Sequence, residues 1–311
     1  MTNSNIDSSK NDAENGTSCG HVAVIGAPNA GKSTLVNALV GQKVAIVSAK
    51  VQTTRARIMG VALHEQAQII LLDTPGIFDP HRRLDRAMVS AAWSGADNAD
   101  LVLLVVDGRA GGGKKFDAIL EKIGSITAPI WLIINKVDIA RKDKLLQLTE
   151  RLNEKVNLAE IYYVSATTQD GLDELKAQLA NAMPHGPWHF PEDQASDISE
   201  RLAAAEITRE QLYHQLHSEL PYASVVETEK YSERDDGSIE IYQQILVERA
   251  SQRAIILGKG GAQIKKIGAA AREEIAKQMG VKVHLYLHVK VDPKWDENKE
   301  IYQNMGLEWV N

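Results

Sequence analysis

The chain has 311 residues, of which 44% are hydrophobic and 24% are charged, and its formal net charge is −6. At roughly 150 residues per domain, this length predicts about two domains with real cores. The single cysteine, Cys19, excludes a disulfide scaffold and a cysteine-rich zinc site and fits a reducing cytoplasm. No apolar run approaches the roughly 20 residues that span a bilayer and no signal peptide opens the chain, so we expect neither an integral membrane protein nor a secreted one.

The charge is unevenly distributed along the chain. Residues 1–190 hold 20 basic and 20 acidic residues, so the remainder carries the whole negative balance. Within that acidic part, residues 253–282 contain seven basic residues against two acidic ones. A net negative protein is a poor general binder of nucleic acid, but this local patch surrounds a glycine-rich turn and could bind phosphates.

The polar N-terminal residues 1–19 contain almost nothing apolar and are predicted to be a disordered tail. Short buried-strand patterns then alternate with helical patterns. The predicted strands lie at 21–25, 58–63, 67–72, 101–106, 130–134 and 161–164, and the predicted helices at 31–40, 84–93, 114–124, 143–157 and 172–181. Continuous apolar strands alternating with helices indicate an α/β domain, here residues 20–183, with a mostly parallel sheet covered on both faces.

The pattern changes after residue 183. Three prolines in residues 183–191 predict a linker, which we place at 184–197. The remaining residues, 198–311, predict an α+β domain that ends in a closing amphipathic helix after residue 291. Its expected elements are a helix at about 198–218, strands at 222–231 and 239–249, a short apolar piece, a glycine turn at 258–261, a helix to about 278 and a strand at 282–291.

One segment between the first strand and the first helix matches the P-loop pattern G-x-x-x-x-G-K-[ST]. Its residues are Gly26, Ala27, Pro28, Asn29, Ala30, Gly31, Lys32 and Ser33, and Thr34 follows. Glycines let backbone N–H groups wrap around phosphates at the positive end of a helix. Lys32 would neutralise the β- and γ-phosphate oxygens, and the Ser33 hydroxyl would ligate Mg²⁺.

Three further motifs follow strands in the order that a GTP site needs. Asp73 could hold the Mg²⁺ shell through water, and the Gly76 amide could sense the γ-phosphate. Asp138 could accept two hydrogen bonds from guanine, which adenine cannot offer, so a buried carboxylate there would reject ATP. Since open α/β sheets bind ligands at the carboxyl ends of their strands, we expect these motifs to converge. Their residues are Asp73, Thr74, Pro75 and Gly76; Asn135, Lys136 and Asp138; and Ser165 and Ala166.

These motifs resemble the GTPase superfamily, with one informative departure. Gln52–Arg55 stands where that superfamily has its first switch loop, and resemblance favours Thr54 over Thr53 as the Mg²⁺ ligand, although the sequence does not separate the two. Ras-like enzymes orient the attacking water with a glutamine after D-x-x-G, but this chain has Ile77. The chain is therefore similar to translation-factor-related GTPases.

The same resemblance suggests a potassium ion. Several of these GTPases use a P-loop asparagine, matched here by Asn29, to hold K⁺ against the phosphates; alternatively, Asn29 only orders the loop. The expected catalytic residues are therefore Lys32, Thr54, Gly76 and Asn29, with slow unaided hydrolysis.

The C-terminal domain contains G-x-x-G between two helical segments, within the basic patch. In KH domains such a loop approaches the backbone of about four nucleotides. The order α-β-β-α-α-β resembles a type II KH domain, although a dimerisation or regulatory module with a basic face is an alternative. The residues predicted to bind RNA are Arg253, Gly258, Lys259, Gly260, Gly261, Ile264, Lys265, Lys266 and Arg272.

Together, the two domains resemble the Era family of bacterial GTPases across about residues 19–309. Supporting segments are 19–20, 187–193, 219–222, 245–249 and 256–268. The resemblance implies GTP-dependent binding to the 3′ end of 16S ribosomal RNA, a role in maturation of the 30S subunit and partial peripheral association with the inner membrane. Two alternatives stay open: a GTPase switch whose C-terminal module binds a protein, and an assembly chaperone that hydrolyses GTP slowly. We expect a monomer.

Overall fold

The computed structural model describes residues 16–48, 50, 53–111, 113–216 and 220–310. The chain forms two compact units. The first contains residues 1–45, 58–79 and 92–197, and the second contains residues 46–57, 80–91 and 198–311. Sequence order alone assigns segments 46–57 and 80–91 to the N-terminal domain, whereas their packing assigns them to the second unit.

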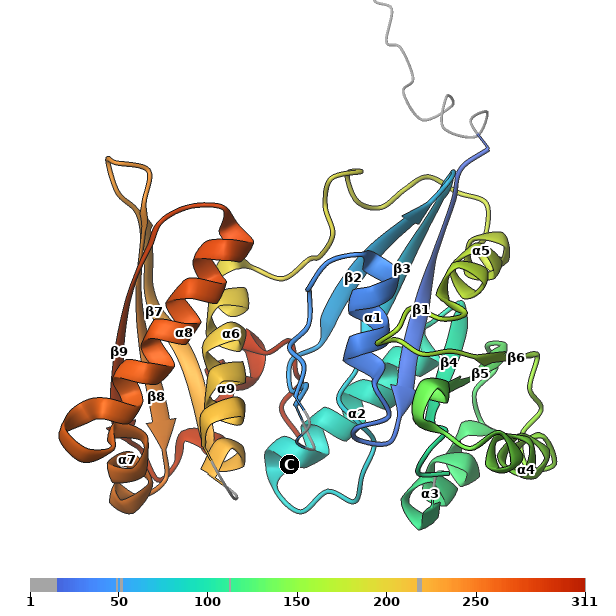
Figure 1. Cartoon of the computed structure of the whole chain (residues 1–311), viewed down its shortest axis with the longest axis horizontal. Helices are drawn as coiled ribbons and strands as arrows, with labels where there is room; N and C mark the ends of the chain where they lie inside the picture. Colours follow the sequence, from blue (N-terminus) through green and yellow to red (C-terminus); the bar gives the residue numbers. More distant parts are fainter. Residues whose placement is uncertain (1–15, 49, 51–52, 112, 217–219, 311) are drawn as a thin grey trace, which may run out of the picture. The chain divides into compact units, whose positions relative to one another are not determined.

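The first unit is built on a six-stranded sheet (Figure 1). The strand order is β2-β3-β1-β4-β5-β6, and only the β2–β3 pair is antiparallel. The strands are β1 (Ser18–Gly26), β2 (Ile58–His64), β3 (Ala67–Asp73), β4 (Leu101–Asp107), β5 (Ile130–Asn135) and β6 (Glu160–Tyr163). Its helices are α1 (Lys32–Val40), α3 (Gly113–Ile123), α4 (Lys142–Asn153) and α5 (Leu172–Ala182), whereas α2 (Arg83–Asp97) begins in the second unit and ends in the first. The predicted α/β fold class is confirmed.

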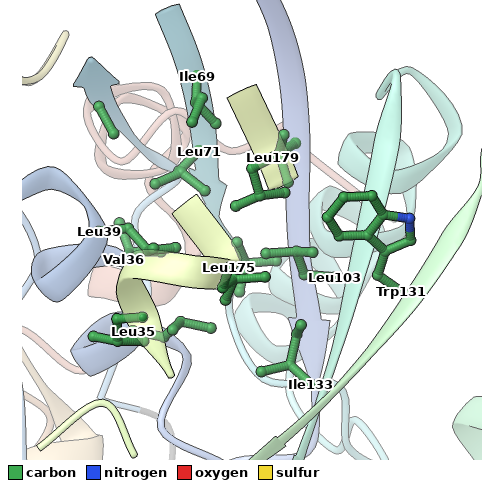
Figure 2. Packing of buried hydrophobic residues seen from close by; sticks show 14 of the residues in the cluster. Leu35, Val36, Leu39, Ile69, Leu71, Leu103, Trp131, Ile133, Leu175 and Leu179 are labelled. Carbon is green, nitrogen blue, oxygen red and sulfur yellow. The ribbon is translucent and has the colours of Figure 1, made fainter. Parts of the chain in front are cut away.

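Helices α1 and α5 cover one face of this sheet (Figure 2). Leu35 of α1 and Leu175 of α5 are fully buried against Leu71 of β3 and Leu103 of β4. The neighbouring strand residues, such as Ala23 and Leu104, are also fully buried although they point to the other face. Burial on both faces explains why the strands read as continuous apolar runs rather than as alternating ones.

Two boundaries differ from the expectation. β1 starts at Ser18, inside the predicted tail, because Ser18 and Cys19 pair with the first two residues of β3. Residues 1–15 of that tail lie outside the described residues. The proline-containing linker is also held by the first unit: Trp188 and Phe190 pack on the cluster of Cys19, Ile70 and Leu72. The linker therefore contributes apolar surface to the core.

The second unit contains a three-stranded sheet in the order β7-β8-β9. Its elements are α6 (Glu200–Gln215), β7 (Ser224–Glu233), β8 (Ile239–Val247), α7 (Ala250–Leu257), α8 (Ala262–Met279), β9 (Val283–Val291) and α9 (Lys299–Asn304). The β7–β8 pair is antiparallel and the β8–β9 pair is parallel. Buried residues of α6 and α8, such as Leu212 and Ile267, pack with Ile245 of β8. Among the described residues, no helix combines the length and apolarity needed to cross a membrane.

Candidate functional site

The P-loop of the first unit is shaped by two glycines that no other residue could replace without strain. Gly26 has φ 151° and Gly31 has φ 94°. A Cβ atom on Gly26 would lie 2.3 Å from the Val105 carbonyl oxygen, and one on Gly31 would lie 2.3 Å from the Asn135 side-chain nitrogen. The loop therefore passes directly against β4 and the end of β5, with α1 starting at Lys32.

Lys32 points back into this loop. Its Nζ atom donates to the Gly26 carbonyl at 3.3 Å and to the Ala27 carbonyl at 3.1 Å. Burial lowers the pKa of Lys32 to about 8, and the nearby Asp73 carboxylate opposes that shift. The charge of Lys32 is thus held among neutral carbonyls, and phosphate oxygens at this position would stabilise it.

Asn135 joins the P-loop to the base-recognition motifs. Its Nδ2 atom donates to the Ala30 carbonyl at 3.0 Å. Its Oδ1 atom accepts from the backbone amide of Lys136 at 2.8 Å and from that of Ala166 at 3.0 Å. This side chain is only 2% exposed, so it links three of the predicted motifs through buried hydrogen bonds.

Lys136 makes a second connection between the P-loop and the motif that follows β5. It has φ 66°, and its Nζ atom lies 2.6 Å from both the Asn29 carbonyl oxygen and Asp107 Oδ2. Sequence reasoning missed Asp107, which contributes this ion pair. The available signal was its place as the last residue of a buried strand, at the same edge of the sheet as the other motifs.

Asp138 lies in a 3₁₀ turn, Val137–Ile139, and its side chain is exposed. The expectation that this carboxylate is buried is wrong for the protein without nucleotide, because the turn extends beyond the end of β5. A guanine base would itself exclude water from this carboxylate. Ser165 is fully buried, and its Oγ atom accepts from the Thr168 amide at 3.2 Å, which shapes the turn after β6.

The Asp73–Gly76 segment lies against the P-loop. Asp73 is fully buried at the end of β3, and the Thr74 hydroxyl donates to the Val24 carbonyl at 2.8 Å. A Cβ atom on Gly76 would lie 2.9 Å from Pro28 Cα, and the Ile77 amide donates to the Gly26 carbonyl at 3.0 Å. The structure therefore brings this motif and the P-loop together.

The segment predicted to be the first switch loop belongs to the second unit. Thr54 is 6% exposed, and the Thr53 hydroxyl donates to the Lys50 carbonyl at 2.8 Å. Gln52 lies outside the described residues. The roles predicted for Thr53 and Thr54 stay predictions. Sequence reasoning assigned no separate role to Arg55, the last residue of the predicted switch loop. In the structure its side chain is 2% exposed and donates hydrogen bonds to three backbone carbonyls.

The G-x-x-G turn lies between α7 and α8 in the second unit. Gly258, Gly260 and Gly261 have φ values of 68°, 60° and 77°. A Cβ atom on Gly258 would lie 2.7 Å from Gln263 Cβ, whereas one on Gly260 or Gly261 would meet nothing within 4 Å. The turn is tightly folded at its first glycine and open at the other two.

The side chains predicted to bind RNA lie around this turn and differ in their exposure and in their contacts. Lys259, Lys265, Lys266 and Arg272 are exposed. Arg253 is also exposed, but its Nε atom donates to the Val289 carbonyl of β9 at 3.0 Å. Ile264 is half-buried and packs on the core of the unit. The side chains on α8 can therefore reach phosphates without disturbing the core.

This fold and these sites define a P-loop GTPase joined to a KH domain. The family model for "50S ribosome-binding GTPase" matches residues 21–136, and the KH domain model matches residues 219–296. GTPase Era of Erythrobacter litoralis is 61% identical over 94% of this chain and 97% of its own length, and that of Afipia carboxidovorans is 57% identical over 94% and 95%. The chain belongs to the GTPase Era family, and it binds and hydrolyses GTP.

Two solved structures resemble the whole chain. One is an Era variant of Aquifex aeolicus bound to GDP and AlF₄⁻, and the other is Era in complex with MgGDPNP and nucleotides 1506–1542 of 16S ribosomal RNA. Each is 37% identical to this chain, with a TM-score of 0.88, and each match covers 93% of this chain and 99% of the other.

Proposed function

We propose that this GTPase binds the 3′ end of 16S ribosomal RNA through its KH domain in a GTP-dependent manner and acts in assembly of the 30S subunit. The observation that carries the RNA part is the open turn at Gly260 and Gly261, beside exposed basic residues of α8. A turn without side chains lets a phosphate backbone approach closely, and the lysines neutralise it. The solved Era complex with 16S ribosomal RNA supports the choice of RNA.

The nucleotide chemistry follows from the first unit. Lys32 places a buried positive charge where the β- and γ-phosphates would lie. The Gly76 amide, held beside the P-loop, is available to sense the γ-phosphate. The side chain of Ile77 has no polar atom with which to orient water, so unaided turnover should be slow and the GTP state long-lived.

Mg²⁺ fits the donor set of this site, because Ser33 and the buried Asp73 offer the hard oxygen atoms that this ion prefers. In this proposal Ser33 binds the ion directly, Asp73 acts through water, and Thr54 adds a further ligand when the γ-phosphate is present. When bound, Mg²⁺ neutralises charge on the phosphates.

We also propose that Asn29 helps to hold K⁺ beside the phosphates. Asn29 has φ 62°, and its carbonyl accepts from Lys136, so its backbone is fixed in an uncommon conformation. Bound K⁺ would supply positive charge in the place of an arginine finger. Replacing KCl by NaCl or LiCl should lower the hydrolysis rate, and Asn29→Ala should remove this dependence. An equal rate in all three salts would exclude the ion.

The decisive experiment measures binding of a single-stranded RNA with the 16S 3′-end sequence to the full chain, loaded with a non-hydrolysable GTP analogue or with GDP. We expect tighter binding in the GTP state, and loss of binding in Gly260→Asp with nucleotide affinity retained. Equal binding in both states would contradict the switch. No RNA binding in either state would favour a protein partner for the KH domain.

We further propose that the protein is cytoplasmic and associates in part with the inner membrane as a peripheral protein. Sedimentation of the purified chain with vesicles of anionic lipid would test the second part. An unchanged soluble fraction at physiological salt would contradict it.

A further inference from the structure

The segment that contains Thr53 and Thr54 follows α1, leaves the first unit after Ala45 and belongs to the second unit until β2 begins. Near its start, the Val47 amide donates to Glu210 Oε1 of α6 at 2.9 Å. At its end, the Arg57 amide donates to the Met305 carbonyl at 3.1 Å. The described part of the segment is therefore held by the unit that carries the G-x-x-G turn.

Arg55 is the most deeply buried of these attachments. Its Nη1 atom donates to the Ser224 carbonyl at 2.7 Å, and its Nη2 atom donates to the carbonyls of Pro221 at 3.1 Å and Tyr222 at 2.8 Å. These three acceptors form the turn that enters β7. A planar guanidinium matches such a fixed set of acceptors, whereas a lysine ammonium offers one point of attachment.

The charge of Arg55 is not required for packing alone. The three backbone carbonyls that it contacts are neutral, the Tyr213 side chain also interacts with it, and the neighbouring Glu206 is engaged by Arg209, whose Nε atom donates to it at 2.8 Å. Burial lowers the pKa of Arg55, and Arg209 adds to the effect, whereas Tyr213 and Glu206 oppose it. An apolar residue would avoid the cost of burying a charge but would leave the three carbonyls without donors, whereas the guanidinium satisfies them and fixes the position of the loop against the turn.

The segment after Gly76 has weaker attachments in the same unit. Arg82 Nη1 lies 3.0 Å from Glu248 Oε1, and the guanidinium of Arg83 lies 4.5 Å from the centre of the Trp309 ring. The Arg82 side chain is 49% exposed, so solvent and salt screen this ion pair. Arg55 is therefore the dominant side-chain anchor among the described residues of the two segments.

We propose that Arg55 is a positioning residue that fastens the Thr53–Thr54 loop to the KH-containing unit and so links the γ-phosphate to RNA affinity. This inference rests on the proposed function, since Thr54 must respond to GTP and the unit must bind RNA. GTP acts on the loop through Thr54, and the turn at 221–224 responds through Arg55. By linkage, RNA then raises affinity for GTP by the same factor.

The test compares the full chain with Arg55→Ala, Arg55→Lys and the matched control Arg57→Ala, an exposed arginine two positions away. For each protein we would measure the affinity for the 16S 3′-end RNA with the GTP analogue and with GDP. The coupling ratio is the affinity in the GTP-analogue state divided by the affinity in the GDP state. The wild-type ratio should lie in the range of about 5 to 150 that is typical of such coupling. It should fall below about 2 in Arg55→Ala, be intermediate in Arg55→Lys and be unchanged in Arg57→Ala.

Two readouts separate positioning from simple loss of structure. Affinity for GDP without RNA should stay within about threefold of wild type in all variants, because Arg55 makes no described contact with the P-loop. Glu210→Ala, which removes the acceptor for Val47, should lower the ratio as well, whereas Glu210→Gln should restore it, since the amide oxygen can still accept. These variants keep the test valid if Arg55→Ala does not fold.

The outcomes distinguish this inference from the proposed function. If wild type shows coupling and Arg55→Ala and Glu210→Ala both keep it, the role of Arg55 is wrong and the switch stands. If wild type binds RNA equally in both nucleotide states, the switch itself is wrong, and the inference is overturned with it.

Discussion

The P-loop and the proposed RNA site of this protein are built in opposite ways. At the P-loop, Gly26 and Gly31 are crowded by backbone and by Asn135, and the polar groups are buried in mutual hydrogen bonds. At the G-x-x-G turn, Gly260 and Gly261 face open space, and the surrounding lysines are exposed. The first site is organised before its ligand arrives, whereas the second is a charged surface.

This difference predicts how each site responds to mutation. A preorganised pocket fails when a single atom is added, because its neighbours cannot move without breaking buried hydrogen bonds. A charged surface loses affinity gradually, because each cation makes a separate and salt-dependent contribution.

Gly31→Ala should abolish nucleotide binding. The new Cβ atom would lie 2.3 Å from Asn135 Nδ2, at a φ of 94° that alanine rarely adopts. We expect destabilisation of about 3 kcal/mol and loss of GDP binding, measured by thermal unfolding and fluorescent-nucleotide titration. Gly41→Ala is the matched control at the other end of α1: its φ is 86°, but nothing lies within 4 Å, so it should cost only about 1 kcal/mol. Equal effects of the two substitutions would contradict a crowded P-loop.

Asp138→Asn should weaken guanine binding without loss of stability, because Asp138 is exposed in the chain. Losing charge-assisted hydrogen bonds to the base should cost about 3 kcal/mol, which is about a hundredfold in GTP affinity. The new amide can donate to a carbonyl at the 2-position, so affinity for xanthosine diphosphate should increase. Asp143→Asn, an exposed carboxylate of α4, is the control. If both variants bound GDP like wild type, the assignment of the base site would be wrong.

The double variant Lys265→Ala, Lys266→Ala should weaken RNA binding in a salt-dependent way. Each lost phosphate contact should reduce the slope of log affinity against log salt by about 0.7. Measuring the affinity for RNA at several KCl concentrations, from about 50 to about 300 mM, would give the slope. Lys142→Ala, Lys144→Ala on α4 removes the same charge from the first unit and should leave the slope unchanged. A similar change of the slope in both double variants would show that RNA affinity depends only on the net charge of the protein.

Glu240→Gln should lower the stability of the fold at neutral pH but not at low pH. Lys230 at 2.8 Å and Arg234 lower the pKa of Glu240 to about 2. A carboxyl group with a lowered pKa stabilises the fold above its unfolded pKa, and this stabilisation is lost as the pH falls. The stability difference between wild type and Glu240→Gln should therefore be constant above about pH 5 and decrease towards pH 2. Urea unfolding at several pH values would measure it, and a pH-independent difference would contradict this origin.

The predicted elements agree closely with the structure where hydrophobic pattern and motif coincide. The strand predicted at 67–72 is observed at Ala67–Asp73, and the helix predicted at 172–181 is observed at Leu172–Ala182. The approach of Gly76 to Pro28 also follows from motif order, because both follow strands that end at one edge of the sheet. Asp107 was missed because a single acidic residue after a strand carries no motif.

The two domains, the nucleotide motifs and the glycine turn could be predicted from local spacing, because each depends on residue types with few alternatives. The assignment of residues 46–57 and 80–91 to the second unit and the burial of Arg55 there emerge only from the folded chain. The Arg55 contacts join residues more than 160 positions apart and end on backbone carbonyls. Since every residue has a carbonyl, such acceptors leave no trace in side-chain pattern, and only the folded chain brings them to the guanidinium.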